Sequence, residues 1–233
     1  MKAILFHHAG GDKYAYRNLQ QSLLPEISCI AVELPGRGDR FSEPLLYTID
    51  EMLKDLFLQI EGELTEEYIL VGMSMGAVLA FLLTHQLNEK NFPLPSVIFL
   101  ASRLPFAHYE TKDNLLELPS DAFWKFIVAY DARSETIVEH EELREIVEPI
   151  LKADFIAMQH FDRKFVGLAP LKIPCFIMNG KDDVQLYDAI RIKEWNNYFT
   201  DKPEYRLFAG GHFFLYEDAE VSGYIKSKIK RER

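Results

Sequence analysis

Short apolar runs alternate with longer segments of helical periodicity along this chain of 233 residues. The apolar runs are nearly continuous, which is typical of parallel strands buried on both faces. They occupy residues 3–6, 28–32, 68–71, 96–101, 174–178 and 204–208. Apolar positions at helical spacing predict helices over residues 14–24, 50–64, 74–88, 187–199 and 218–229. The alternation predicts an α/β fold, with a mainly parallel central sheet flanked by helices, in one domain spanning residues 1–233.

The interval between the fourth and fifth predicted strands is much longer than one crossover helix requires. It carries helical patterns over residues 120–130, 141–152 and 154–163. Its aromatic residues are Phe106, Tyr109, Phe123, Trp124, Phe126, Tyr130, Phe155 and Phe161. Insertions in such sheets gather at the carboxyl ends of the strands, where ligands bind, so we expect a helical lid at about residues 103–165. For most of these aromatic side chains, packing within the insert is the favoured interpretation.

Composition narrows the class of protein and its partners. Hydrophobic residues make up 48% of the chain and charged residues 27%, which is ordinary for a soluble globular protein. The net charge of −10 argues against a nucleic-acid partner. No apolar run is long enough for a membrane span or a signal peptide, which predicts a cytoplasmic protein without membrane association. Cys29 and Cys175 lie in strand-like runs and are expected to be buried, reduced thiols.

One predicted strand–turn–helix segment carries a pattern with chemical meaning. The motif Gly72-Met73-Ser74-Met75-Gly76 follows the third strand. This Gly-x-Ser-x-Gly order is typical of a nucleophile elbow, where strained backbone lifts a serine hydroxyl out of the sheet. The two glycines allow the close backbone approach that the turn needs. Ser74 is therefore the candidate nucleophile, and a glycine-rich turn without chemistry is the alternative, because short motifs also occur by chance.

A serine at such an elbow requires a base and a carboxylate that orients the base. Asp182 and Asp183 follow the fifth strand, and His212 follows the sixth, which is the usual order of acid and base after the serine. The carboxyl ends of parallel strands share one edge, so we predict a catalytic triad of Ser74, Asp183 and His212 there. Asp183 is preferred because it stands three residues after Gly180, and Asp182 remains the alternative. Of the seven histidines, His212 is the one that follows the acidic loop.

The segment after the first strand supplies a second expected part of the site. Residues 7–11 read His-His-Ala-Gly-Gly, and small residues let backbone N–H groups approach a substrate carbonyl. The N–H groups of Ala9 and Met75 are the candidate oxyanion hole. A metal site that uses His7 and His8 is discounted, because adjacent side chains on a strand point to opposite faces. We therefore predict neither a metal nor a bound cofactor.

Five sequence blocks together carry a family pattern. They are Phe6-His7-His8-Ala9-Gly10-Gly11 with Tyr16-Arg17, Glu33-Leu34-Pro35-Gly36-Arg37 with Asp39-Arg40, the elbow motif, Leu151-Lys152-Ala153-Asp154-Phe155, and Gly210-Gly211-His212-Phe213-Phe214-Leu215. These blocks resemble the type II thioesterases, stand-alone α/β-hydrolases that accompany nonribosomal peptide and polyketide synthases. The chain departs from the family at His7, where proline is usual, at Met73, where histidine is usual, and at Lys152, where arginine is usual. Met73 is expected to alter the pocket beside Ser74.

The resemblance implies an α/β-hydrolase fold and a serine thioesterase that hydrolyses acyl groups from the phosphopantetheine arm of acyl or peptidyl carrier protein domains. Such enzymes clear stalled or wrongly primed carriers. In this reading His212 deprotonates Ser74, an acyl-enzyme forms, and water then releases the acid. The enzyme is expected to be a monomer.

Several alternatives stay open at the level of the sequence. Arg37, Arg40 and Arg103 follow strand-like runs and are hypothetical contacts for an acidic carrier, although solvated surface is the favoured interpretation for each of them alone. A general carboxylesterase acting on small acyl esters would share the triad and the lid. A noncatalytic α/β-hydrolase used as a binding protein and an acyltransferase are further candidates.

Overall fold

The computed structural model describes the chain except for residues 65–66, 105–116, 131–133, 160–166, 184–187 and 232–233. In chain order, with η for a 3₁₀ helix, its elements are β1 (Lys2–Phe6), η1 (Lys13–Tyr16), α1 (Arg17–Leu23), β2 (Ser28–Ala31), η2 (Gly38–Arg40), α2 (Ile49–Ile60), η3 (Glu61–Glu63), β3 (Tyr68–Met73), α3 (Met75–Glu89), β4 (Val97–Ala101), α4 (Ser120–Tyr130), α5 (Glu135–Val138), α6 (Glu141–Gln159), β5 (Cys175–Gly180), η7 (Arg191–Tyr198), β6 (Glu204–Phe208), α7 (Phe214–Glu217) and α8 (Glu220–Arg231). Each predicted strand is present, with its ends shifted by at most two residues.

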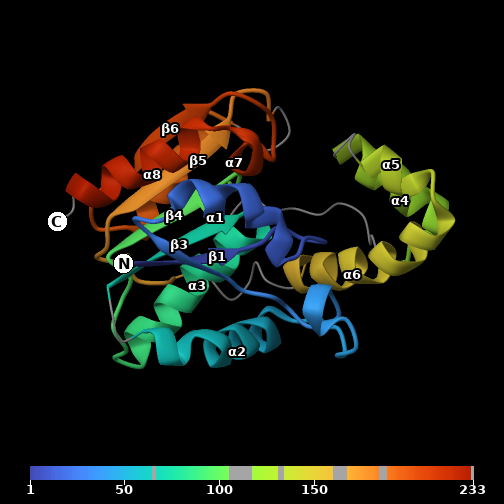
Figure 1. Cartoon of the computed structure of the whole chain (residues 1–233), viewed down its shortest axis with the longest axis horizontal. Coiled ribbons are helices and arrows are strands. Elements are labelled where there is room, and N and C mark those ends of the chain that lie inside the picture. The colour runs from blue at the N-terminus through green and yellow to red at the C-terminus, as the bar shows by residue number, and fades with distance from the viewer. Residues whose placement is uncertain (65–66, 105–116, 131–133, 160–166, 184–187, 232–233) are drawn as a thin grey trace.

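A six-stranded sheet in the order β2-β1-β3-β4-β5-β6 forms the centre of the molecule (Figure 1). All of its pairings are parallel. The chain passes from β1 outward to β2, then returns to pair β3 with the other side of β1. The direction of winding therefore reverses between β1 and β3, and ligands of open parallel sheets bind at the carboxyl ends beside such a reversal.

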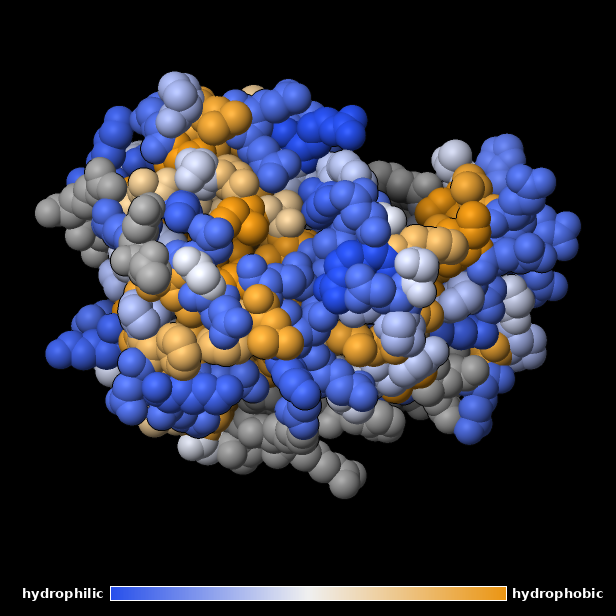
Figure 2. All heavy atoms as spheres, turned by 60° about the horizontal axis from the view of Figure 1, so that its bottom comes forward, coloured by the Kyte–Doolittle hydropathy of each residue, from blue (hydrophilic) through white to orange (hydrophobic). Residues whose placement is uncertain are grey.

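Alternate residues of the strands face two separate hydrophobic cores. In β1, Ile4 and Phe6 pack with α2 and α3, whereas Ala3 and Leu5 pack with α1 and α8. The outer strands β2 and β6 are partly exposed, unlike the inner strands, because each has a neighbour on one side alone. Figure 2 brings the α2 side forward and shows hydrophilic side chains over much of this face, with hydrophobic patches between them.

Several predicted helices differ from the observed ones. The pattern over residues 14–24 is divided into η1 and α1, and the pattern over residues 187–199 forms the 3₁₀ helix η7 in its described part. The C-terminal pattern gives α8, preceded by the short α7. The two patterns predicted at residues 141–152 and 154–163 belong to one helix, α6, because Ala153 between them is a strong helix former and is buried. Residues 160–163 lie outside the described residues.

A helical insert of α4, α5 and α6 lies between β4 and β5 and extends from one side of the sheet (Figure 1). Phe123, Trp124 and Ile127 of α4 pack against Leu151 and Phe155 of α6 in a cluster of their own. The packing interpretation is thereby confirmed for these aromatic residues and for Phe126, which packs against the cluster. The side chains of Phe106, Tyr109, Tyr130 and Phe161 lie outside the described part of the chain.

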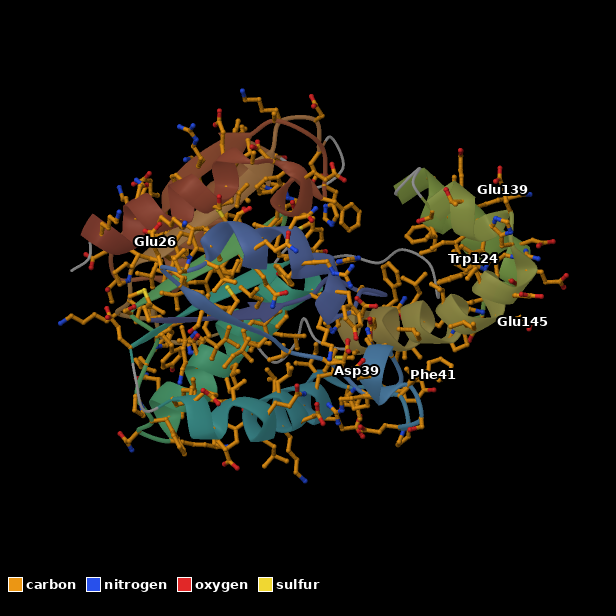
Figure 3. The ribbon with its side chains drawn as sticks, in the orientation of Figure 1. Glu26, Asp39, Phe41, Trp124, Glu139 and Glu145 are labelled. Carbon is orange, nitrogen blue, oxygen red and sulfur yellow. The ribbon has the colours of Figure 1, made fainter. Side chains whose placement is uncertain are left out.

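One carboxylate joins the two long helices of the insert. Glu148 of α6 accepts hydrogen bonds from Trp124 Nε1 at 2.8 Å and Ser120 Oγ at 2.5 Å. Lys152 pairs with the same carboxylate at 2.7 Å. Figure 3 shows Trp124 within the insert, and Glu139 and Glu145 on its outer side.

Among the described residues, no helix combines the length and the apolar character that crossing a bilayer requires.

Candidate active site

Ser74 stands alone between the end of β3 at Met73 and the start of α3 at Met75. Its backbone has φ 53° and ψ −114°, in the left-handed half of conformational space that residues with a side chain rarely adopt. Such a conformation costs about 1–3 kcal/mol and persists where the surroundings enforce it. Here the Ser74 N–H donates to the Ala101 carbonyl oxygen of β4 at 2.9 Å. The predicted elbow therefore has the strained geometry that its sequence pattern indicated.

The two glycines of the elbow are required by close backbone contacts. A Cβ atom on Gly76 would lie 2.0 Å from the carbonyl oxygen of Phe6, at the end of β1. A Cβ atom on Gly72 would lie 2.3 Å from the carbonyl oxygen of Gly76. Because these contacts are with backbone, they cannot be relieved by rotating a side chain. The first turn of α3 is thus packed directly against the end of β1.

His212 and Asp183 form the second part of the site. His212 lies between β6 and α7, and its Nδ1 is 2.8 Å from Asp183 Oδ2. A carboxylate only accepts hydrogen bonds, so this contact places the proton of the neutral ring on Nδ1 and a lone pair on Nε2. Asp182 is exposed, and its backbone N–H donates to the Gly210 carbonyl oxygen at 3.0 Å. The structure therefore gives His212 the partner that the spacing favoured, Asp183.

The loops that carry these two residues are held against each other. The Lys181 N–H donates to the carbonyl oxygen of Phe208 at 2.9 Å. A Cβ atom on Gly180 would lie 2.1 Å from the carbonyl oxygen of Gly211, so glycine is required for this approach. The hydroxyl of Ser102 donates to the carbonyl oxygen of His212 at 2.6 Å. The position of His212 is consequently set by contacts from both β4 and β5.

Ser102 is one residue that the sequence reasoning missed. It is buried directly after β4, has a φ of 49°, and links the neighbouring strand to the histidine loop. One signal in the sequence could have indicated Ser102. It follows the carboxyl end of β4, which lies between β3, before Ser74, and β5, before Asp183.

A pocket brings the candidate residues together. It encloses about 140 Å³, and Ser74, Met75, His212 and Ala9 all line it. The insert supplies apolar walls, with Ile127, Ile137, Val147, Leu151 and Phe155. A hydroxyl, an imidazole and aliphatic walls in one pocket suit an acyl group bound for attack at its carbonyl.

The loop after β1 lines this pocket and is held by several close contacts. Gly10 has φ +75°, and a Cβ atom there would lie 2.3 Å from Leu151 Cδ2 of α6. The Gly11 N–H donates to the His8 carbonyl oxygen at 3.1 Å, and the Gly10 N–H donates to Asp154 Oδ2 at 2.7 Å. Ala9 lies directly before these two residues and contributes to the pocket. Small residues in this segment thus allow it to pack closely against α6, and the predicted approach of its N–H groups to a substrate carbonyl stays a prediction.

The two adjacent histidines of this loop have different surroundings. His7 is buried, its Nδ1 lies 2.9 Å from the His8 carbonyl oxygen, and burial together with the nearby Arg37 charge lowers its pKa to about 4. His8 lines the pocket, and its Nδ1 is 2.9 Å from the hydroxyl of Tyr216. Among the described residues, no group of three or more His, Cys, Asp or Glu side chains is arranged to hold a metal ion.

The hypothetical carrier contacts are corrected by the structure. Arg37 is 3% exposed and forms a two-bond pair with Asp154, so neither a docking role nor solvated surface describes it. Arg40 pairs in the same way with Asp55 and also contacts Glu43. Arg103 is buried and lines the pocket, which places it inside the site rather than on a docking surface.

Two further expectations concern Met73 and the thiols. Met73 is fully buried in the core beside α1 and α8 and is absent from the described lining of the pocket, so the expectation that it alters the pocket is wrong. Its side chain follows the strand alternation to the face away from α3.

Cys29 and Cys175 form no disulfide, and burial raises the pKa of the Cys29 thiol to about 11. Both cysteines are therefore protonated thiols at neutral pH. Cys175 is buried as predicted, whereas Cys29 is partly exposed.

Comparison with known proteins adds the family. The family model of the thioesterase domain matches residues 2–230. The chain belongs to the thioesterase domain family. Among curated relatives of this thioesterase chain, the thioesterase PikA5 of Streptomyces venezuelae is 25% identical over 217 residues, covering 92% of this chain and 75% of its own length. A protein of Brevibacillus parabrevis named linear gramicidin dehydrogenase LgrE is 27% identical over 218 residues, covering 92% of this chain and 82% of its own length.

Solved structures agree with this assignment. ClbQ from the colibactin NRPS/PKS pathway superposes with a TM-score of 0.89 at 26% identity, over 99% of this chain and 97% of that one. The expected α/β-hydrolase fold, a parallel sheet flanked by helices, is thereby confirmed, as is the resemblance to type II thioesterases. The expectation of a thioesterase of the serine hydrolase class is confirmed at the level of the family.

Proposed function

We propose that this thioesterase removes acyl groups from the phosphopantetheine arm of carrier protein domains, with Ser74 as nucleophile, His212 as base and Asp183 as the residue that orients the base. One observation carries the proposal: a strained elbow serine shares an apolar-walled pocket with a histidine whose Nδ1 is bonded to a buried carboxylate. Relatives named for thioesterase activity and for NRPS/PKS pathways support the carrier-bound thioester as substrate.

The first half of the reaction forms an acyl-enzyme. The Nε2 lone pair of His212 takes the proton of the Ser74 hydroxyl while the oxygen attacks the thioester carbonyl carbon. The negative charge that develops on the carbonyl oxygen is met by the N–H groups of Ala9 and Met75, the latter at the start of α3, where the helix dipole is positive. Asp183 stabilises the imidazolium that forms in this step.

The second half of the reaction restores the enzyme. The phosphopantetheine thiolate leaves, and a proton from His212 neutralises it. His212 then takes a proton from the water that attacks the Ser74 ester, and it returns this proton to the Ser74 oxygen as the free acid leaves. A thiolate is a good leaving group, so binding of the arm and the acyl chain contributes most to selectivity. The insert, as a lid over the pocket, supplies the apolar contacts for the acyl chain.

The proposal includes an editing role, carrier domains of a nonribosomal peptide or polyketide synthase as partners, and a monomeric cytoplasmic enzyme that needs no cofactor.

The word dehydrogenase in the name of LgrE is not carried over to this chain. After the first strand, residues 7–12 read His-His-Ala-Gly-Gly-Asp. This segment lacks the Gly-x-Gly-x-x-Gly spacing of a dinucleotide-binding loop.

The test compares carrier-bound and free substrates. A holo carrier protein is loaded with a short acyl group, and release of the acid is followed with wild type and Ser74→Ala, beside the p-nitrophenyl ester of the same acid. The proposal expects carrier deacylation that is lost in the variant, and weaker turnover of the ester. Faster turnover of the ester would favour a general carboxylesterase. No turnover, or equal rates for the variant, would favour a binding protein, and acyl transfer to an added amine would reveal an acyltransferase.

A further inference from the structure

The root of the insert is connected to the loop after β1 by a buried carboxylate that the reaction itself does not use. Asp154 of α6 is fully buried. Its Oδ2 accepts the hydrogen bond from the Gly10 N–H at 2.7 Å. Gly10 directly follows Ala9, the proposed oxyanion donor, so the carboxylate holds the peptide unit that comes next along the chain.

A second contact turns this hydrogen bond into a clamp. Arg37 donates to Asp154 through Nη1 at 2.7 Å and Nη2 at 2.8 Å, and its Nη1 also reaches the Gly11 carbonyl oxygen at 3.2 Å. Asp154 thus accepts from the loop at Gly10, and Arg37 donates to the loop at Gly11. The two side chains are also bonded to each other. In Figure 1 the loop that carries η2 lies against the sheet-side end of α6. Figure 3 labels Asp39 and Phe41 on this loop.

Stability alone is a weak explanation for such a pair. Taking both charges out of water offsets most of their attraction, and apolar side chains of similar size often give an equally stable fold. Apolar replacements would, however, leave the Gly10 N–H without its acceptor and the Gly11 carbonyl without its donor. The distinctive contribution of the pair is thus the placement of the loop.

We propose that Asp154, held by Arg37, is a positioning residue that sets the oxyanion loop of the thioesterase reaction and connects it to the lid helix α6. This inference rests on the proposed function. Oxyanion donors act when they lie about 2.7–3.1 Å from the developing charge, so a small displacement of the Ala9 peptide weakens the transition state more than the bound substrate. Loosening the clamp should lower kcat and leave KM nearly unchanged.

The chain offers a matched control on the same loop. Arg40 and Asp55 form a two-bond pair at 2.7 and 2.8 Å, close in sequence to Arg37, but their contacts do not include the oxyanion loop. The experiment compares the double variants Arg37→Met/Asp154→Leu and Arg40→Met/Asp55→Leu on an acyl-loaded carrier protein. We expect about a 100-fold lower kcat for the first, comparable to loss of one oxyanion donor, with KM within about twofold. The control should stay within about twofold of wild type in both constants.

A binding measurement separates positioning from a general structural role. An alkylboronic acid, which forms a tetrahedral adduct with an active-site serine, should lose affinity for the first double variant by about the factor lost in kcat. A carrier loaded through a nonhydrolysable thioether should bind as it does to wild type. Thermal unfolding by circular dichroism identifies variants that do not fold, in which case Asp154→Asn provides the same comparison, with a smaller loss of about tenfold.

The outcomes distinguish this inference from the proposed function. Wild type that releases no acid contradicts the proposed function. Active wild type together with an unchanged kcat in the folded clamp variant overturns the positioning role alone. Equal loss of boronic acid and thioether binding, or an equal loss of kcat in the control pair, would also overturn it.

Discussion

The loops at the sheet edge and the helical insert contribute to the same pocket in different ways. At the sheet edge, backbone contacts determine each position: Ser74 is held at positive φ, and Gly76 and Gly180 have no room for a side chain. In the insert, aliphatic and aromatic side chains pack in a cluster joined by Glu148. We infer that the loops at the sheet edge carry the chemistry, and that the insert, apart from Asp154, determines which acyl groups fit. The sheet edge should tolerate almost no change, whereas the insert should tolerate changes of volume.

The sharpest test of this difference lies within one loop. Asp183→Asn should lower kcat by about 10⁴-fold, because an amide can stabilise the wrong tautomer of His212 and cannot stabilise its charged form. Asp182 directly precedes Asp183 in the chain and is exposed, so the kcat of Asp182→Asn should stay within about twofold of wild type. Steady-state deacylation of an acyl carrier measures both variants. Similar losses in the two, or a larger loss for Asp182→Asn, would break the assignment of the acid.

The sheet region should also determine the response to acid. Burial lowers the pKa of His7 and of His85 in α3 to about 4, while the unfolded chain takes up these protons near the ordinary value of 6.5. Between pH 6.5 and 4 the unfolded state therefore binds more protons, so stability is full above this window and falls as the pH drops. From pH 7 to 5 each histidine should cost about 2 kcal/mol.

Urea unfolding at the two pH values measures this loss. His7→Gln should reduce the difference between pH 7 and 5 by about the contribution of one histidine. The same pH dependence in wild type and in the variant would show that His7 is protonated equally in the folded and unfolded states.

The insert should show a smaller effect, on selectivity alone. Ile127 lines the pocket from α4, and Ile127→Ala enlarges the space for the acyl chain. We expect kcat/KM to shift by about tenfold toward longer acyl groups, the size of effect that one or two methylene groups give in an apolar pocket. A series of carriers loaded with acyl groups of increasing length measures it. An equal loss for every chain length would mean that Ile127 serves the chemistry or the fold instead.

Features that repeat locally were predictable from the sequence. The six strands follow from continuous apolar runs, and the elbow and the Asp183–His212 pair follow from short motifs at strand ends, which parallel topology brings to one edge. The sequence predicts two helices in place of the continuous α6, because a single sequence does not show that Ala153 is buried within one helix that also contains Pro149.

Contacts between distant segments were not predictable from a single sequence. Arg37 and Asp154 are 117 positions apart, and neither residue's local pattern indicates its partner. For this reason the sequence predicts solvated surface or a carrier contact for Arg37, whereas the structure shows a buried ion pair. The direction of Met73 required the register of β3 relative to α3, which the motif alone does not provide. The surroundings of Ser102 likewise depend on the arrival of the histidine loop from the other end of the chain.

Trapping the acyl-enzyme tests the central claim most directly. Wild type is mixed with a carrier bearing an acyl group, the reaction is stopped with acid within milliseconds, and peptides of the enzyme are analysed by mass spectrometry. The account predicts the mass of the acyl group on the peptide that contains Ser74, transient in wild type and absent in Ser74→Ala. Rapid release of the acid with no adduct, or an adduct on another residue, would contradict it.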